Sequence, residues 1–177
     1  VIEKRTAGLH HGYLHAVTHG VHFFVLHLAP GRQRQKKRRE EAAIMAEAIQ
    51  PLLDRNDKVA VLGDFNDLSP FDPIPTMRGE RPDSWDYTVL RRFMDTGLID
   101  VCHDTAGQRG DAPANTCPTR LDETEDGKAE QDRGSWRIDY VLVSPALREK
   151  VTNAFSPRGG MLEKISDHYP IVVKIQR

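Results

Sequence analysis

Apolar and polar residues follow three different patterns over the first sixty positions, and each pattern predicts a different element. β-branched and aromatic residues cluster at Tyr13–Thr18 and Val21–Leu28 on either side of His19-Gly20, which is typical of two strands joined by a tight turn. From Gln33 to about Asp54, apolar residues recur at four-residue spacing, which is typical of an amphipathic helix. A continuous apolar run at Lys58–Leu62 then predicts a strand buried on both faces.

The order strand, helix, strand predicts a βαβ unit. A helical crossover of this length returns the second strand parallel to the first, so the carboxyl ends of both strands lie at one edge of the sheet. Further along the chain, a second helix is expected at Thr88–Thr96, and two more strands at Arg137–Val143 and Tyr169–Ile175. The polar stretch Asp104–Ser135 between them predicts a long loop.

Length and composition favour one α/β domain over residues 1–177 with an ordinary surface. A chain of 177 residues is long enough for one hydrophobic core and short for two. A net charge of −1 with 29% charged residues favours neither nucleic acid nor membrane as a partner, and no apolar run approaches the roughly 20 residues that cross a bilayer. Cys102 and Cys117 lack metal-ligand spacing, which leaves only a single disulfide open.

Polar side chains stand at the ends or starts of four predicted strands. Asp64 and Asn66 follow the buried strand in Gly63-Asp64-Phe65-Asn66, and His27 ends the strand before it. Taken alone, such an Asp and Asn are more often turn formers that bond their own backbone. Asp139 lies inside an apolar strand, and Asp167-His168 directly precede the last one. If the last two strands run antiparallel to the first two, these groups meet in one cleft.

Four short motifs in this order resemble those of the endonuclease/exonuclease/phosphatase family. They are HL at the end of one strand, GDFN after the next, RIDYVLVSP, and the terminal SDHYPIVV. The resemblance covers residues 13 to 177. It implies an α/β fold that is part of a four-layer sandwich, with two mixed sheets flanked by helices. It also implies a hydrolase that acts on phosphoesters with Mg²⁺ or a similar ion such as Mn²⁺.

Carried over by position, the resemblance implies roles in water activation and metal binding for three of these residues. Asp64 is expected to orient or deprotonate the attacking water, and Asn66 to donate a hydrogen bond to a phosphate oxygen. Asp167 is expected to ligate the metal, because carboxylate oxygen is the natural ligand for Mg²⁺. These roles suit in-line hydrolysis, which needs a positioned water and charge neutralisation on the phosphate oxygens.

The same resemblance implies roles in phosphate contact and substrate binding for the others. His168 is expected to contact the scissile phosphate while Asp139 holds its imidazole in one tautomer. His27 would be a second phosphate-binding or proton-donating imidazole. Thr116 lies in Asn115-Thr116-Cys117-Pro118-Thr119, which is similar to a substrate-facing segment of the family, and Trp136 either stacks on a base or sugar or simply packs.

The chain departs from the family pattern at its beginning. Family members have an earlier strand pair that contributes an Asn and a metal-binding Glu, and no equivalent precedes Tyr13; Glu3 is too close to the start. The N-terminal half of the fold is therefore expected to be missing, and this chain alone is expected to bind metal weakly and hydrolyse slowly or not at all. The uncovered apolar face predicts self-association or association with the missing half.

Two further clusters have a functional and a structural interpretation. A basic run at the start of the first helix fits phosphate contact, but it also fits a solvated helix end paired with the glutamates that follow. The run comprises Arg32, Arg34, Lys36, Lys37, Arg38 and Arg39. A histidine-rich start suggests zinc, although exposed alternating strand positions explain it more simply. Its members are His10, His11, His15, His19 and His22.

The sequence therefore favours a divalent-metal-dependent hydrolase of phosphoester bonds, either a nuclease or a phosphodiesterase or phosphatase. The basic run favours nucleic acid slightly over a small or lipid phosphodiester as the substrate. The alternative is a binding or scaffold domain that keeps the fold without catalysis. A metal-independent phosphatase fits poorly, because no Cys or Ser lies in a Gly-rich phosphate-binding turn.

Overall fold

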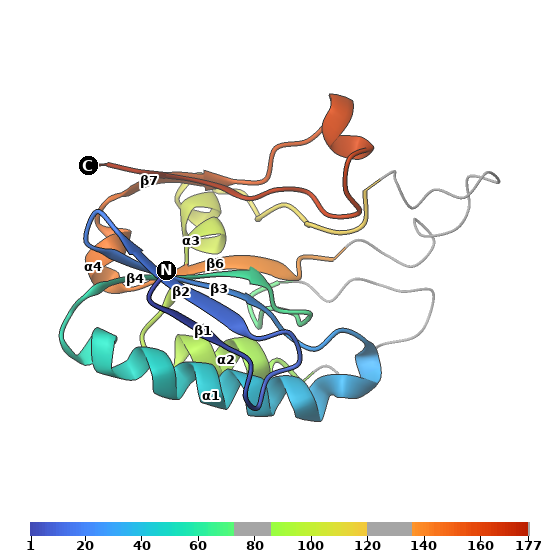
Figure 1. Cartoon of the computed structure of the whole chain (residues 1–177). Helices are drawn as coiled ribbons and strands as arrows, with labels where there is room; N and C mark the ends of the chain where they lie inside the picture. Colours follow the sequence, from blue (N-terminus) through green and yellow to red (C-terminus); the bar gives the residue numbers. More distant parts are fainter. Residues whose placement is uncertain (73–85, 120–135, 177) are drawn as a thin grey trace.

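The computed structural model describes residues 1–72, 86–119 and 136–176 as an arrangement of two sheets and several helices (Figure 1). Its strands are β1 Glu3–Arg5, β2 Tyr13–Thr18, β3 Val21–His27, β4 Lys58–Asp64, β5 Ile99–Asp100, β6 Asp139–Val143, β7 Val151–Phe155 and β8 Val172–Ile175. The α-helices are α1 Gln35–Asp54, α2 Thr88–Met94, α3 Val101–Gln108 and α4 Pro145–Arg148, and short 3₁₀ turns lie at Arg32–Arg34 and Gly160–Glu163. No helix in this part of the chain is long and apolar enough to cross a membrane.

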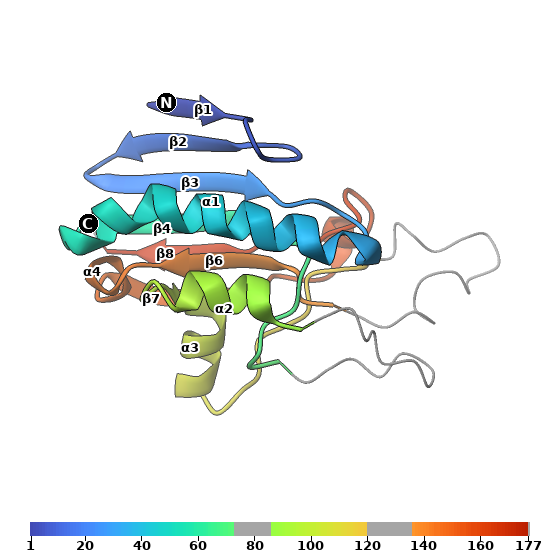
Figure 2. The same ribbon diagram turned by 90° about the horizontal axis from the view of Figure 1, so that it is seen from below.

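The larger sheet has the strand order β1-β2-β3-β4-β6-β5, which Figure 2 shows from below. β3 and β4 are parallel and are joined by α1, so the predicted βαβ unit is confirmed. β6 runs antiparallel to β4, while β8 pairs with β7 in a separate two-stranded sheet. The predicted convergence of strand ends therefore involves both sheets.

The larger sheet lies between two different layers. Helices α1 and α2 cover one face, and the β7–β8 sheet and α3 lie over the other (Figure 1). The core beneath α1 and α2 includes Phe24, Met45, Ile49 and Phe93, all fully buried. Each such side chain contributes about 1.5–3 kcal/mol to stability through its removal from water. Because β4 is buried on both faces, its sequence is a continuous apolar run.

The predicted loop Asp104–Ser135 is wrong at its start, because α3 occupies Val101–Gln108. The carboxylate of Asp100 caps this helix by accepting hydrogen bonds from the backbone N–H groups of Cys102 and His103. A helix this short shows little periodicity, so its cap is the only strong sequence signal. Residues 120–135 of the predicted loop lie outside the described residues.

The basic run is not a uniformly solvated helix end, because Arg38 is fully buried. Its guanidinium donates to the carbonyls of Ala29 and Gly31 at 2.9 and 2.7 Å and to the side chain of Gln35. A buried arginine is tolerated only when its donors are satisfied in this way. Arg38 thus fastens the connection after β3 to the first turn of α1.

Not every residue of the histidine-rich start lies at an exposed strand position. His15 is only 9% exposed, its ring stacks on Phe24, and its Nε2 lies 3.0 Å from Nδ1 of His22. Burial, followed by the neighbouring His22, lowers the pKa of His15. The neutral form of this imidazole packs like an aromatic side chain on the sheet.

Arg137, at the entrance to β6, forms the most buried ion pairs in the described part of the chain. Its guanidinium donates to both oxygens of Asp72 at 2.7 and 2.9 Å, and it lies 2.6 Å from Asp100 Oδ2. Its side chain is 2% exposed. Arg137 therefore joins the segment after β4, the start of α3 and the strand that carries Asp139.

Replacing Arg137 with Ala is expected to destabilise the chain by about 3–5 kcal/mol, because two buried carboxylates lose their counter-charge. Urea unfolding followed by circular dichroism measures the change. Arg109→Ala is the matched control: Arg109 is half-exposed beside Asp111, and its loss should cost less than about 1 kcal/mol. Equal losses in the two variants would contradict this account of Arg137.

Candidate functional site

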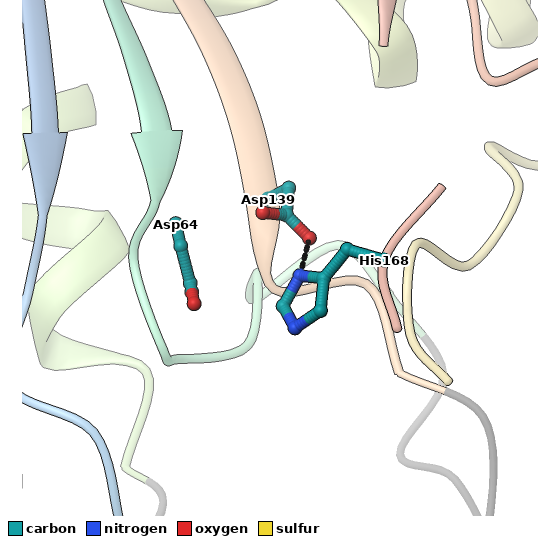
Figure 3. A group of neighbouring side chains, drawn as sticks. All are labelled: Asp64, Asp139 and His168. Atoms are coloured by element: carbon teal, nitrogen blue, oxygen red, sulfur yellow. Dashed lines mark hydrogen bonds and ion pairs between the residues drawn. The ribbon is translucent and has the colours of Figure 1, made fainter. Parts of the chain in front are cut away.

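Three titratable side chains meet at the edge of the larger sheet: Asp64, Asp139 and His168 (Figure 3). Asp64 ends β4 and Asp139 begins β6, and the two residues lie opposite each other in the antiparallel register. His168 comes from the segment before β8, and its Nδ1 lies 2.8 Å from Asp139 Oδ2. One ligand atom from each residue lies within 4.8 Å of the other two. The predicted convergence of these three residues is present.

The glycine of the GDFN motif permits this end of β4. Gly63 has a φ of 136°, and a Cβ atom there would lie 1.9 Å from the carbonyl oxygen of Leu26. Only glycine fits so close an approach between two backbones. Asp64 Oδ1 then accepts a hydrogen bond from the N–H of Asn66 at 2.7 Å, and the Asn66 amide donates to the carbonyl of Leu28 at 3.1 Å. Asp64 and Asn66 therefore also act as turn formers, because both side chains bond the nearby backbone.

Asp64 is held in an unfavourable environment for a carboxylate. Its side chain is 17% exposed, and burial, followed by repulsion from Asp139, raises its pKa to about 6. The hydrogen bond from the Asn66 backbone opposes this shift. A carboxylate with such a pKa is still ionised at neutral pH and is a stronger base than an ordinary aspartate.

His168 is held as an imidazolium. The hydrogen bond to Asp139, followed by the contact with Cys117, raises the pKa of His168 well above its usual range. Asp139 is in turn positioned by Thr116, whose buried hydroxyl accepts a hydrogen bond from the Asp139 backbone N–H at 3.2 Å. The geometry leaves the second ring nitrogen of His168 as a donor.

His27 lies on the same edge, as the parallel pairing of β3 and β4 requires. Its Nε2 is 3.5 Å from Asp64 Oδ2, and its ring stacks on His11 with centroids 4.3 Å apart. Burial, followed by the proximity of His11, lowers the pKa of His27. His27 is therefore the neutral imidazole of the site and His168 the charged one.

The remaining predicted residues lie at different depths. Asp167 is exposed and is not part of the three-residue group, although its backbone carbonyl accepts from the Thr119 N–H at 3.0 Å. Thr116 is 1% exposed and Trp136 is 9% exposed. The Trp136 backbone pairs with Cys117, and this bridge carries Thr116 beneath Asp139. Direct contact of Thr116 or Trp136 with a substrate stays a prediction.

Sequence reasoning missed two contributors to this site. His11 stacks on His27, and Cys117, a free thiol, touches His168. Both residues come from segments without regular periodicity, so their positions depend on tertiary packing. The sequence indicated a functional position for them only indirectly, because His11 belongs to the histidine-rich start and Cys117 to the segment around Thr116.

The group fits a hard divalent cation. Asp64 and Asp139 lie opposite each other, and burial, followed by repulsion from Asp139, raises the pKa of Asp64 to about 6. Carboxylate oxygens are the preferred ligands of Mg²⁺, and a cation beside two carboxylates relieves such repulsion. The described residues offer few other oxygen ligands, so most of the coordination shell would be water.

Replacing Asp64 with Asn is expected to stabilise the chain at pH 7 more than at pH 4. Because its pKa is raised from 3.8 to about 6, the folded state holds this proton more tightly than the unfolded state, and the wild-type chain loses stability as pH rises through that window. The largest gain expected in the free energy of unfolding is about 3 kcal/mol. Urea unfolding at both pH values measures it, with exposed Asp54→Asn as the control. A gain that does not grow with pH would contradict the assigned environment.

Comparison with known proteins places this geometry in a familiar fold. The 3' phosphatase from Neisseria, solved with a product DNA hairpin, superposes with a TM-score of 0.68 at 21% identity, covering 93% of this chain and 65% of that one. An AP endonuclease from Archaeoglobus fulgidus gives a TM-score of 0.67 at 18% identity, with the same coverages of 93% and 65%. The AP endonuclease of Leishmania major gives 0.65 at 14% identity, covering 94% of this chain and 54% of that one.

These similarities establish the fold, two sheets flanked by helices, and this chain spans less than two thirds of each of those proteins. None of the curated proteins compared matches the sequence. The sequence does match the model of the endonuclease/exonuclease/phosphatase family over residues 10–168, from the histidine-rich start to His168. The chain therefore belongs to the endonuclease/exonuclease/phosphatase family.

Proposed function

We propose that this chain hydrolyses phosphoester bonds with the help of a divalent cation. The observation that carries the proposal is the meeting of Asp64 with the Asp139–His168 pair at one sheet edge. It combines a carboxylate of raised pKa with a fixed imidazolium, which are a proton acceptor and an anion-binding donor. The proposal also follows the activities after which the family is named.

Each member of the group has a separate role. Asp64, ionised at neutral pH, orients the attacking water and takes its proton. His168 donates from its second ring nitrogen to a phosphate oxygen, while Asp139 fixes the first nitrogen at 2.8 Å. His27 is neutral and lies on the opposite side of Asp64, so it would accept or donate a proton near the leaving group.

Asp64 and Asp139 would hold the cation, with exposed Asp167 as a further carboxylate from the segment that carries His168. When bound, Mg²⁺ or Mn²⁺ would neutralise charge on the phosphate oxygens. Because Asp139 is already paired with His168, the affinity of these residues alone for Mg²⁺ is expected to be weak. Slow turnover is expected for this reason and, from the sequence, because no equivalent of the family's metal-binding Glu precedes Tyr13.

Nucleic acid is the favoured substrate. The Neisseria relative was solved with a DNA product, and the helix that begins beside the proposed site carries a basic run. A row of cations near a phosphoester site lowers the electrostatic cost of approaching a polyanion. A small or lipid phosphodiester is the second candidate, because a single phosphate satisfies the three-residue group equally well.

The face of the sheet opposite α1 is a candidate surface for association. Leu14 and Val25 are cross-strand partners on β2 and β3, and they are 41% and 44% exposed. The β7–β8 sheet covers Val21 and Ala60 further along the same sheet face but does not cover these two residues. Adjacent exposed apolar side chains favour a second chain or chain segment as cover.

Cleavage of plasmid DNA or bis(4-nitrophenyl) phosphate is expected to require Mg²⁺ or Mn²⁺. Asp64→Ala and His168→Ala should each lower the rate by about 10²-fold or more, because each removes a proton acceptor or an oxyanion donor. His19→Asn, in the turn at the far end of β2, is the control and should not alter the rate. Metal-independent cleavage, or full activity in both variants, would refute the proposal; folded chain without any cleavage would favour a binding domain.

The His168 imidazole is expected to stay protonated at pH 8 in metal-free buffer and to titrate near its ordinary value of about 6.5 in Asp139→Asn, because the variant removes the carboxylate that stabilises the cation. The Cε1 proton shift in an NMR titration reports this change. Asp167→Asn alters the adjacent residue without removing the bond to the ring, so it should leave the titration of His168 in place. An identical titration in wild type and Asp139→Asn would show that the pair does not form.

A further inference from the structure

A set of nitrogen-bearing side chains extends outward from His27, and its other members, His10, His11 and Arg34, take no part in the chemistry above. His10, His11 and His27 form a contiguous row, with ring centroids 4.3 Å apart at both contacts. At the outer end of the row, Arg34 Nη1 lies 3.1 Å from Nε2 of His10. At the inner end, His27 lies 3.5 Å from Asp64. The row therefore runs from the start of α1 to the catalytic edge.

This row is held by a buried framework. Glu41 on α1 is fully buried, and its two carboxylate oxygens accept hydrogen bonds from the backbone N–H groups of His10 and Ala29. Lys37 donates to the carbonyl of Gly8 at 2.9 Å. One helix thus fixes both the segment that carries His10 and His11 and the segment that follows His27. Preorganised donors bind an anion more tightly than mobile ones.

The local charge balance favours an anionic ligand. Within residues 1–72, 86–119 and 136–176, His10, His11 and Arg34 form no ion pair with a carboxylate, and Glu41 is occupied by backbone donors. The first turn of α1 contains no acidic residue, and its N-cap makes no side-chain hydrogen bond. The partial positive charge of this 20-residue helix therefore adds to that of Arg34.

We propose that His10, His11 and Arg34, together with His27, bind a non-scissile phosphate of the substrate beside the position of cleavage. The proposal rests on the proposed function, since it assumes that the scissile phosphate lies at Asp64 and His168. It assigns the substrate class as a strand with consecutive phosphates, because the row leads away from Asp64 and offers a second phosphate its own donors. Arg34 supplies the permanent charge, and the imidazoles supply ring N–H donors.

A metal ion is a poor occupant of this row. His11 and His27 stack with their rings inclined by only 25°, so their in-plane nitrogen lone pairs do not converge, and His10 meets His11 edge to face at 68°. The guanidinium of Arg34 beside His10 would repel a cation. Among the described residues, the metal-capable group comprises Asp64, Asp139 and His168 and contains none of His10, His11 or Arg34.

The test is binding of a 5'-labelled single-stranded oligonucleotide, measured by fluorescence anisotropy in EDTA so that nothing is cleaved. The doubly substituted chain His11→Gln/Arg34→Gln is expected to bind at least about tenfold more weakly than wild type, the equivalent of about 1.4 kcal/mol. Arg34→Gln alone should reduce the slope of log affinity against log salt by about 1. Thymidine 5'-monophosphate, with one phosphate, should compete poorly against the strand.

Two controls separate this subsite from general attraction by the basic helix end. Lys36→Gln removes an exposed cation two residues after Arg34 and should weaken binding less than Arg34→Gln. Arg55→Gln removes a cation at the opposite end of α1, where it pairs with Asp57, and should leave binding unchanged. Circular dichroism and urea unfolding verify that each variant is folded, which is expected because all the substituted side chains are exposed.

The outcomes distinguish the subsite from the proposed hydrolysis. Equal binding by wild type and the double variant, or an equal loss in Lys36→Gln, overturns the subsite even if the chain cleaves DNA. A selective loss of oligonucleotide binding supports the subsite even if no cleavage is detected. In the NMR spectrum, added oligonucleotide should shift the His11 ring signals and leave those of His19 in place; the reverse pattern also overturns the proposal.

Discussion

The antiparallel pairing of β6 with β4 is the constraint on which the site depends. It places Asp139 opposite Asp64, two residues whose like charges repel and whose alignment burial alone would not favour. A shift of β6 by one residue would turn the Asp139 side chain to the opposite face of the sheet, away from Asp64. The register is held at one end by Ser144, which bonds the backbone of Val59 and Asp57, and at the other by the bond from Phe65 to Ile138.

A chain that keeps two facing carboxylates must compensate for them elsewhere. Asp64 costs stability at neutral pH because burial removes water from its carboxylate, and the hydrogen bond from the Asn66 N–H compensates only in part. Close by, Arg137 pairs with two other acidic side chains, Asp72 and Asp100, and fixes the start of β6. The strand that carries Asp139 is therefore anchored next to the site. This division between a stabilised framework and an electrostatically strained site is typical of catalytic centres.

Local sequence predicted those parts of the fold that depend on periodicity. The hairpin, α1 and β4 follow from apolar spacing, and the meeting of His27 with Asp64 follows from the helical crossover that makes their strands parallel. The site's third member could be placed only on the condition that the last strands run antiparallel to the first two, because His168 reaches Asp139 from a separate sheet. The resemblance of SDHYP to a family motif then supplied its expected role. The burial of Arg38 was missed because charge runs are usually solvated.

At the start of α1, one charge run combines an architectural role with the binding role that we propose. Arg38 points inward to the carbonyls after β3, whereas Arg34 lies outside against His10. One residue thus fixes the strand end that carries His27, while a neighbour one turn away extends the same positive region into solvent. Among the described residues, Arg34 forms no ion pair with a carboxylate, and the nearby Glu41 is occupied by backbone donors. The exposed charge of Arg34 is therefore available to the phosphate ligand that we propose, whereas the charge of Arg38 is spent on holding the fold together.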